Sequence, residues 1–127
     1  MYSSQVLDHF QNPRSAGDLP DATVTGEVQN PACGDVMQLS LKIVDGCIVD
    51  AAFRAKGCVP SIACGSALVE MVRGQSLASA AAITREQIIE QLGGLPPASS
   101  HAAQLAIDAV KAALAVSREQ PVRRGQL

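Results

Sequence analysis

Four side chains of this sequence have the chemical types that bind metal ions or activated sulfur. Cys33 and Asp35 flank Gly34 in a turn-rich segment, and Cys58 and His101 follow further along the chain. Two thiolates, one imidazole and one carboxylate would form a tetrahedral zinc site or hold an iron–sulfur cluster with mixed ligands. No cysteine pair has the C-x₂-C spacing of zinc fingers, so spacing alone leaves open that the four are unrelated.

Two of these side chains lie at the starts of predicted helices. Cys58 precedes a segment that Pro60 is well suited to begin as a helix. Backbone N–H groups and the dipole at a helix start favour a thiolate, the form that binds metal or attacks sulfur. His101 falls in the first turn of the predicted last helix, where the same dipole disfavours imidazolium and favours the neutral ligand form.

The other two cysteines and the other histidine are expected to be structural. Cys64 shares a helical stripe with Leu68 and Met71 at i, i+4 and i+7, which is typical of a core, although a functional thiol at Cys64 stays the alternative. Cys47 is expected to pack within a β-hairpin. His9 is expected to lie on a helix face rather than to bind metal.

Composition indicates one globular domain in a reducing compartment. The chain has 127 residues, of which 47% are hydrophobic, enough for one core. We expect a single domain over residues 1–119 and a frayed tail over 120–127. A net charge of −2 without a basic stripe argues against nucleic acid, and no apolar run reaches the ~20 residues that span a membrane. Without a signal-peptide pattern at the start, we expect a cytoplasmic protein.

The elements expected around these residues make an α+β domain, a three-stranded antiparallel sheet with helices packed on one face. Alternating apolar residues predict strands over 37–43 and 49–55, with a further strand over 23–29. Helices are expected over 1–10, 60–73, 84–92 and from Ser99 or Ser100 to about 119. The last helix carries an apolar stripe from Ala102 to Ala113.

The register of the predicted hairpin decides which residues meet at its open end. A two-residue loop would place apolar Leu41 opposite charged Asp50, whereas a three-residue loop over 44–46 matches every buried position. The second register pairs Ile43 with Cys47, Leu41 with Val49, Leu39 with Ala51 and Met37 with Phe53. If this register continues past the open end of the hairpin, Cys33 lies near Gly57 and therefore beside Cys58.

Six short stretches, spread along nearly the whole chain, match the pattern of one known family. They read VLDHFQNPR at residues 6–14, PACGDVM at 31–37, FRAKGC at 53–58, GQSL at 74–77, LPP at 95–97 and DAVKAA at 108–113. In these stretches, and in their order, the sequence resembles the NifU/IscU-type iron–sulfur cluster assembly scaffold proteins. The Ala-Cys-Gly-Asp and Gly-Cys segments are the most specific.

The resemblance implies the family's α+β fold and a scaffold role rather than an enzyme activity. Iron and sulfide would combine on it, usually into a [2Fe–2S] cluster, before transfer to acceptor proteins, and zinc often binds when the cluster is absent. The family's ligand positions fall on Cys33, Asp35, Cys58 and His101. A cysteine desulfurase that supplies sulfur as persulfide is the implied partner.

Two positions depart from the family's pattern. The family normally has a third cysteine directly after the histidine, where it receives persulfide and binds the cluster, but here that residue is Ala102. Residues 95–99 read LPPAS, whereas the chaperone-recruiting form of the family has Leu-Pro-Pro-Val-Lys. Recruitment of a chaperone is therefore left open.

Three functions are consistent with these residues. The leading hypothesis is an iron–sulfur scaffold or carrier. The second, supported by Ala102, is a zinc-binding or regulatory module of the same fold that has lost cluster assembly. The third is a thiol enzyme with Cys58 as nucleophile and His101 as base, although the sequence offers no identifiable set of oxyanion donors.

Overall fold

The computed structural model describes residues 2–31 and 34–119. In chain order the elements are α1 (Ser4–Gln11), β1 (Val24–Gln29), β2 (Val36–Val44), β3 (Cys47–Lys56), α2 (Val59–Val72), α3 (Leu77–Ala81), α4 (Arg85–Gln91), the 3₁₀ turn η1 (Pro97–Ser99) and α5 (Ser100–Glu119). Among these, α3 and the turn η1 are the elements that the sequence patterns did not predict.

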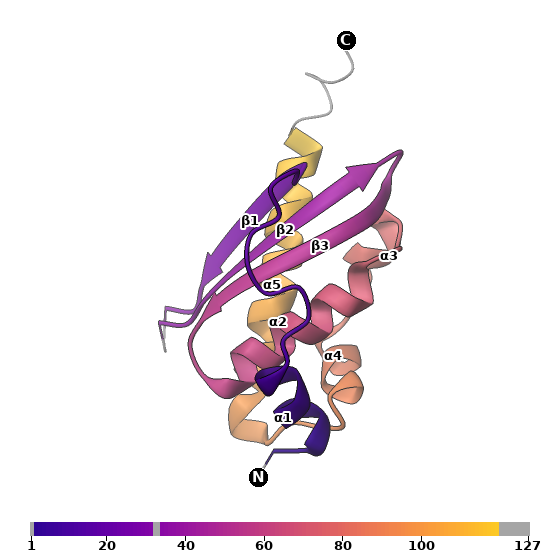
Figure 1. The fold of residues 1–127 in the computed structure, drawn as a ribbon. Helices are drawn as coiled ribbons and strands as arrows, with labels where there is room; N and C mark the ends of the chain where they lie inside the picture. The colour runs from indigo at the N-terminus through magenta and orange to yellow at the C-terminus, as the bar shows by residue number, and fades with distance from the viewer. Residues whose placement is uncertain (1, 32–33, 120–127) are drawn as a thin grey trace.

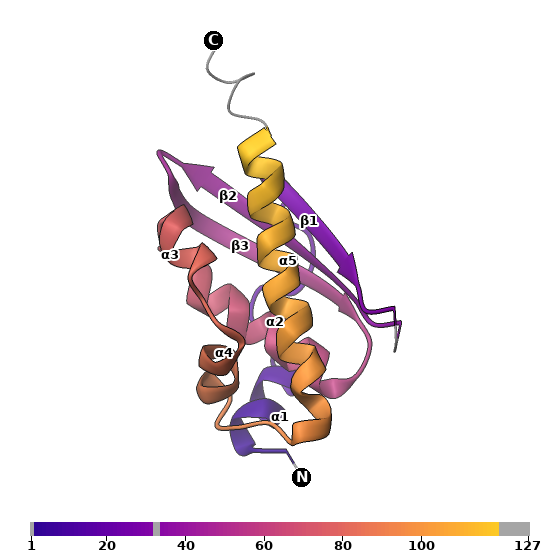
Figure 2. The same ribbon diagram turned by 180° about the vertical axis from the view of Figure 1, so that it is seen from behind.

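The strands form one layer and the helices form the other (Figures 1 and 2). The sheet is antiparallel in the order β1-β2-β3. The helices α2 and α5 lie on the same face of it, and Figure 2 shows α5 running across that face. The predicted α+β class is therefore confirmed. Within residues 2–31 and 34–119, no helix is both long and apolar enough to cross a membrane.

Small side chains bring α5 close to the sheet. The predicted apolar stripe of this helix is fully or almost fully buried at Ala102, Leu105, Ala106, Ala109, Val110 and Ala113. At Gly26 of β1, an added Cβ would lie 2.4 Å from the Ala113 backbone nitrogen, so only glycine allows this approach. Close packing of this kind sets where the first turn of α5, with His101, lies relative to the strands.

The β2–β3 hairpin closes through a two-residue turn, and the predicted three-residue loop is wrong. Asp45 and Gly46 have φ angles of 52° and 77°, the left-handed values that a type I′ turn requires at both central positions. The pairs nearest this turn are Val44 with Cys47, Ile43 with Ile48 and, after a shift in register, Lys42 with Asp50.

A β-bulge at Val49 brings the apolar residues back to the same face. Because Val49 is the extra residue on β3, Ile48 is buried and Val49 is 46% exposed. Beyond the bulge the pairs are Leu41 with Ala51, Leu39 with Phe53 and Met37 with Ala55. A two-residue turn conflicts with the apolar pattern only when the ladder is unbroken, and the bulge interrupts the ladder.

The corrected register changes which residue reaches the open end of the hairpin. Val36 pairs with Lys56, so Asp35 is the described residue that continues the ladder toward Cys58. Cys33 itself lies outside the described residues. The predicted meeting of Cys33 and Cys58 at this end therefore stays a prediction, and among the described residues the Asp35 carboxylate is the neighbour of Cys58.

A buried histidine joins α1 to α2. His9 is 5% exposed, and its Nδ1 lies 2.7 Å from Ser66 Oγ. The Arg14 backbone N–H donates to the same oxygen at 2.8 Å. His9 Nε2 lies 3.5 Å from Glu70 Oε1. Because a carboxylate can only accept, the neutral ring carries its hydrogen on Nε2, and Nδ1 accepts from the Ser66 hydroxyl. His9 is thus a helix-packing residue.

Protonation of His9 should destabilise the fold. Burial is the main reason that the pKa of His9 lies below the ordinary 6.5, and the charge of Arg14 lowers this pKa further. Because the unfolded chain binds the proton more readily, the contribution of His9 to stability is complete above about pH 6.5 and is lost as the pH falls toward the folded-state pKa. Urea unfolding between about pH 7 and pH 5 should show a steeper loss for the intact chain than for His9→Gln. Parallel pH profiles would contradict this role.

Candidate metal centre

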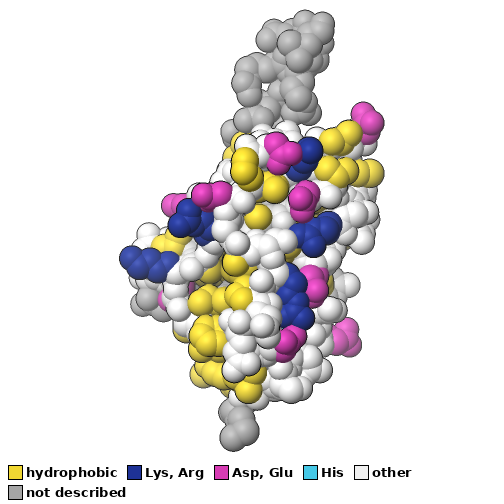
Figure 3. All heavy atoms as spheres, viewed as in Figure 1, with side chains coloured by type: hydrophobic (Ala, Val, Ile, Leu, Met, Phe, Trp, Pro, Cys, Tyr) yellow, Lys and Arg dark blue, Asp and Glu magenta, His cyan; other side chains and the backbone are white. Residues whose placement is uncertain are grey.

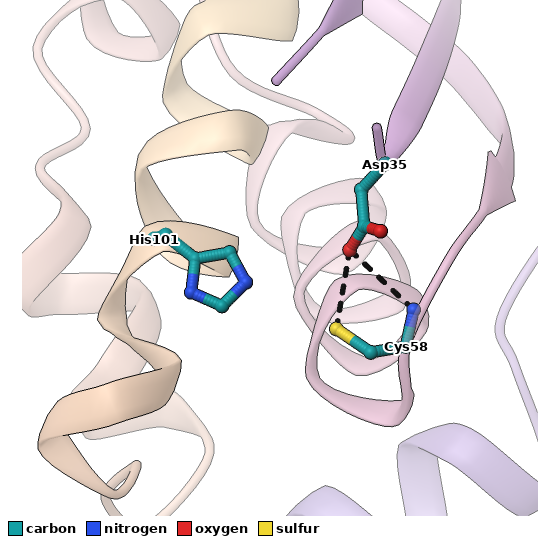
Figure 4. Close-up of side chains that lie close together, drawn as sticks. All are labelled: Asp35, Cys58 and His101. Atoms are coloured by element: carbon teal, nitrogen blue, oxygen red, sulfur yellow. Dashed lines mark hydrogen bonds between the residues drawn. The ribbon is translucent and has the colours of Figure 1, made fainter. Parts of the chain in front are cut away.

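Three of the four predicted ligands lie together at one end of the sheet (Figure 4). Asp35 directly precedes β2, Cys58 is the N-cap of α2, and His101 is in the first turn of α5. One ligand atom from each residue lies within 4.8 Å of the other two. Asp35 is buried, His101 is half-buried and Cys58 is exposed, so the group opens to solvent. These three side chains are close enough to bind one ion.

The Asp35 carboxylate lies against the first residue of α2. Its Oδ2 accepts a hydrogen bond from the Cys58 thiol at 3.2 Å and another from the Cys58 backbone N–H at 3.4 Å, as Figure 4 shows. No side chain of α2 caps this helix start, so a carboxylate from a distant segment lies at its positive end. A sulfur and an oxygen ligand are thereby held in contact.

His101 turns one ring nitrogen toward this pair. Its Nδ1 lies 3.1 Å from the Ala98 carbonyl oxygen, and because a carbonyl can only accept, Nδ1 carries the hydrogen. Nε2 then keeps its lone pair, which is the arrangement of metal-binding histidines. Figure 4 shows a ring nitrogen of His101 on the side that faces Asp35 and Cys58. The turn η1, which contains Ala98, therefore orients the imidazole.

Ser61 is a polar group of this site that the sequence patterns did not indicate. It is fully buried, its Oγ donates to Asp35 Oδ2 at 2.7 Å, and the same Oγ lies 3.4 Å from Cys58 Sγ. The sequence signal that could have indicated Ser61 is its spacing from Cys58. Residues i and i+3 of a helix share a face, and Ser61 follows Cys58 by three positions. That signal does not reveal the carboxylate, which comes from another part of the chain.

Replacement of Gly57 should displace the carboxylate. A Cβ at this position would lie 2.4 Å from Asp35 Cγ, and the φ of +157° is unfavourable for alanine. We expect Gly57→Ala to weaken binding of Co²⁺ by about tenfold or more, because Asp35 must move away from Cys58. Calorimetric titration with Co²⁺ measures this change.

Gly46 provides the matched control for that substitution. It also has a positive φ, of +77°, but an added Cβ there would meet no atom within 4 Å, and it lies at the other end of the hairpin. Gly46→Ala should strain the backbone and leave the affinity for Co²⁺ unchanged. Equal affinities in the two variants would show that Gly57 does not make room for Asp35.

The two remaining cysteines differ from each other. Cys64 is fully buried, and burial raises the pKa of its thiol to about 12, with a smaller contribution from Cys58. A buried thiol of this kind is protonated and inert, which confirms the prediction of core packing. Cys47 is exposed, so its predicted packing within the hairpin is wrong; Cys47 pairs with exposed Val44 directly beside the two-residue turn.

Known proteins of similar sequence cover nearly the whole chain. Over 118 residues the chain is 51% identical to the iron-sulfur cluster assembly scaffold protein IscU of Haemophilus influenzae. This match covers 90% of this chain and 93% of that protein. The chain is also 48% identical over 118 residues to the protein of the same name from Escherichia coli, and this match covers 90% of this chain and 91% of that protein.

A solved structure and a family model agree with these relatives. The crystal structure of a nitrogen-fixing NifU-like protein (N-terminal) from Brucella abortus has the same fold, with a TM-score of 0.74 at 21% identity over 93% of this chain and 94% of that one. The model of the NifU-like N-terminal domain matches residues 1–123. The chain therefore belongs to the NifU-like N-terminal domain family.

Proposed function

We propose that this protein is a scaffold on which an iron–sulfur cluster is assembled and from which it passes to acceptor proteins. The observation that carries the proposal is the meeting of Asp35, Cys58 and His101, with ligand atoms within 4.8 Å of one another, in a chain 51% identical to a protein named as such a scaffold. The cluster is cargo, so no turnover chemistry is required. Residues 1–119 would act as the single scaffold domain.

Four residues are proposed to hold the cargo. Cys33 and Cys58 would anchor iron as thiolates, the soft ligands that iron–sulfur clusters use. His101 would bind through Nε2, since Nδ1 is engaged by Ala98. Asp35 would bind through a hard carboxylate oxygen, which holds a cluster less tightly than a thiolate does. The proposed cluster is [2Fe–2S], and zinc would occupy the same set tetrahedrally when the cluster is absent.

Sulfur is proposed to arrive from a cysteine desulfurase as persulfide, and apo iron–sulfur proteins are the proposed recipients. The position after His101 is Ala102, which is fully buried, and Cys64 is buried and protonated. The thiols proposed to receive sulfur are therefore Cys33 and the exposed Cys58. If sulfide instead arrived free in solution, neither thiol would need to form a persulfide.

Anaerobic reconstitution tests this function. The full chain is incubated with ferrous iron, a cysteine desulfurase, cysteine and a dithiol reductant that reduces persulfide sulfur to sulfide, and the visible absorption and the bound iron and sulfide are measured. We expect a visible-absorbing cluster with equal amounts of iron and acid-labile sulfide. A protein that binds zinc under the same conditions but never forms a cluster would contradict the proposal.

A further inference from the structure

Ser61 is a buried hydroxyl that contacts two of the proposed ligands. It lies in the first turn of α2, fully removed from solvent, where a polar group is destabilising unless it is hydrogen-bonded. Its partners are Asp35 Oδ2 at 2.7 Å and Cys58 Sγ at 3.4 Å. The shorter contact has the normal length of an O–H···O hydrogen bond, so the hydroxyl hydrogen points to the carboxylate.

Asp35 Oδ2 accepts hydrogen bonds of different kinds from Cys58 and Ser61. One comes from the Cys58 thiol, and this bond cannot persist when the sulfur binds a metal as a thiolate. Another comes from Ser61, which has no proton to give up on metal binding. The Ser61 bond therefore remains when metal replaces the thiol hydrogen, together with the weaker one from the Cys58 backbone N–H at 3.4 Å.

We propose that Ser61 is a positioning residue that fixes the Asp35 carboxylate at the metal-binding site, so that an incoming ion meets an oxygen ligand already in place. The chemistry is that of outer-sphere hydrogen bonds, which orient metal-binding carboxylates. Ser61 acts through Asp35 and does not itself bind the ion. This inference depends on the proposed function only for what the site carries, which is an iron–sulfur cluster.

The affinity for Co²⁺ tests this role in the full chain, and the intensity of sulfur-to-cobalt charge-transfer absorption follows binding. Ser61→Ala should weaken binding by about tenfold. Ser66→Ala is the matched control, because Ser66 is equally buried on α2 but bonds to His9 and Arg14. It should leave the affinity unchanged, and urea unfolding confirms that both variants are folded during the titration. Wild-type affinity in Ser61→Ala would overturn the proposal.

A double-mutant cycle separates positioning of Asp35 from general support of the helix. In an Asp35→Ala background, Ser61→Ala should change the affinity by less than about twofold, because the group that it positions is gone. The same tenfold loss in both backgrounds would overturn the proposal. Co²⁺ binding reports on the ligand set whether or not a cluster forms, so a chain that binds Co²⁺ normally and assembles no cluster would contradict the proposed function alone.

Discussion

Cys58→Ser should abolish stable cluster assembly. Cys58 is the described thiol at the site, it is exposed, and it lies within 4.8 Å of the other two ligand groups. Serine keeps the size of the side chain but replaces a soft, readily deprotonated sulfur with an alcohol that binds iron–sulfur clusters poorly. After anaerobic reconstitution, the visible absorption and bound sulfide should fall by about tenfold or more relative to the intact chain.

Cys47→Ser is the control for this result. Cys47 is likewise exposed, but it lies beside the turn at the opposite end of β3. Its replacement removes one reactive thiol and leaves the metal centre intact, so assembly should be unchanged. Full cluster assembly in Cys58→Ser, or equal losses in both variants, would show that the cluster is not bound where Asp35, Cys58 and His101 meet.

Asp35→Ala should slow the release of an assembled cluster. The carboxylate lies against Cys58 Sγ and is the hardest donor among the proposed ligands. Its proposed bond to the cluster would therefore be the one most easily exchanged for an acceptor's thiolate. Without it, transfer should be slower by about tenfold, equivalent to a barrier higher by ~1.4 kcal/mol. This rate is a separate quantity from the equilibrium affinity for a single Co²⁺ ion, which the same substitution should weaken.

The transfer kinetics of Asp35→Ala can be followed by circular dichroism as the cluster moves to an apo-ferredoxin. Glu27→Ala is a suitable control, because Glu27 is an exposed acidic residue on β1 and its loss changes the net charge by the same amount. Transfer from the control should match that from the intact chain. An unchanged or faster rate in Asp35→Ala would contradict the role of the carboxylate in release.

The chemistry of the site could be predicted because it depends on residue type. Thiol, imidazole and carboxylate groups bind metal wherever a fold brings them together, and the helix starts at Cys58 and His101 could be recognised from local signals such as Pro60. The burial of Cys64 was equally accessible, since its helical stripe with Leu68 requires no knowledge of distant segments.

The hairpin register could not be predicted because a distant segment decides it. Ile48 and Val49 are both β-branched and apolar, so the local pattern fits either one on the buried face. The Ile48 backbone N–H donates to the Gln75 carbonyl at 2.8 Å, and its carbonyl accepts from the Gly74 N–H at 2.7 Å. These contacts with the segment after α2 favour burial of Ile48 and produce the bulge at Val49.

The contacts that support the proposed ligands could not be predicted from the sequence either, because they also depend on distant segments. Ser61 bonds to a carboxylate 26 positions away in the sequence, and Gly57 makes room for that carboxylate. Even the local bond from His101 Nδ1 to the Ala98 carbonyl depends on the 3₁₀ turn that precedes α5. Each contact depends on how separate elements are placed, which residue types do not specify.

Transfer in the presence of an iron chelator tests the scaffold function most directly. The intact chain, loaded with cluster, is mixed anaerobically with an apo-ferredoxin and excess chelator that captures any iron released into solution. We expect the ferredoxin to gain its complete cluster at the same rate with and without the chelator, because the cluster passes from protein to protein. Formation of holo-ferredoxin only when the chelator is absent would show that the cluster falls apart first, and that this protein is not a carrier.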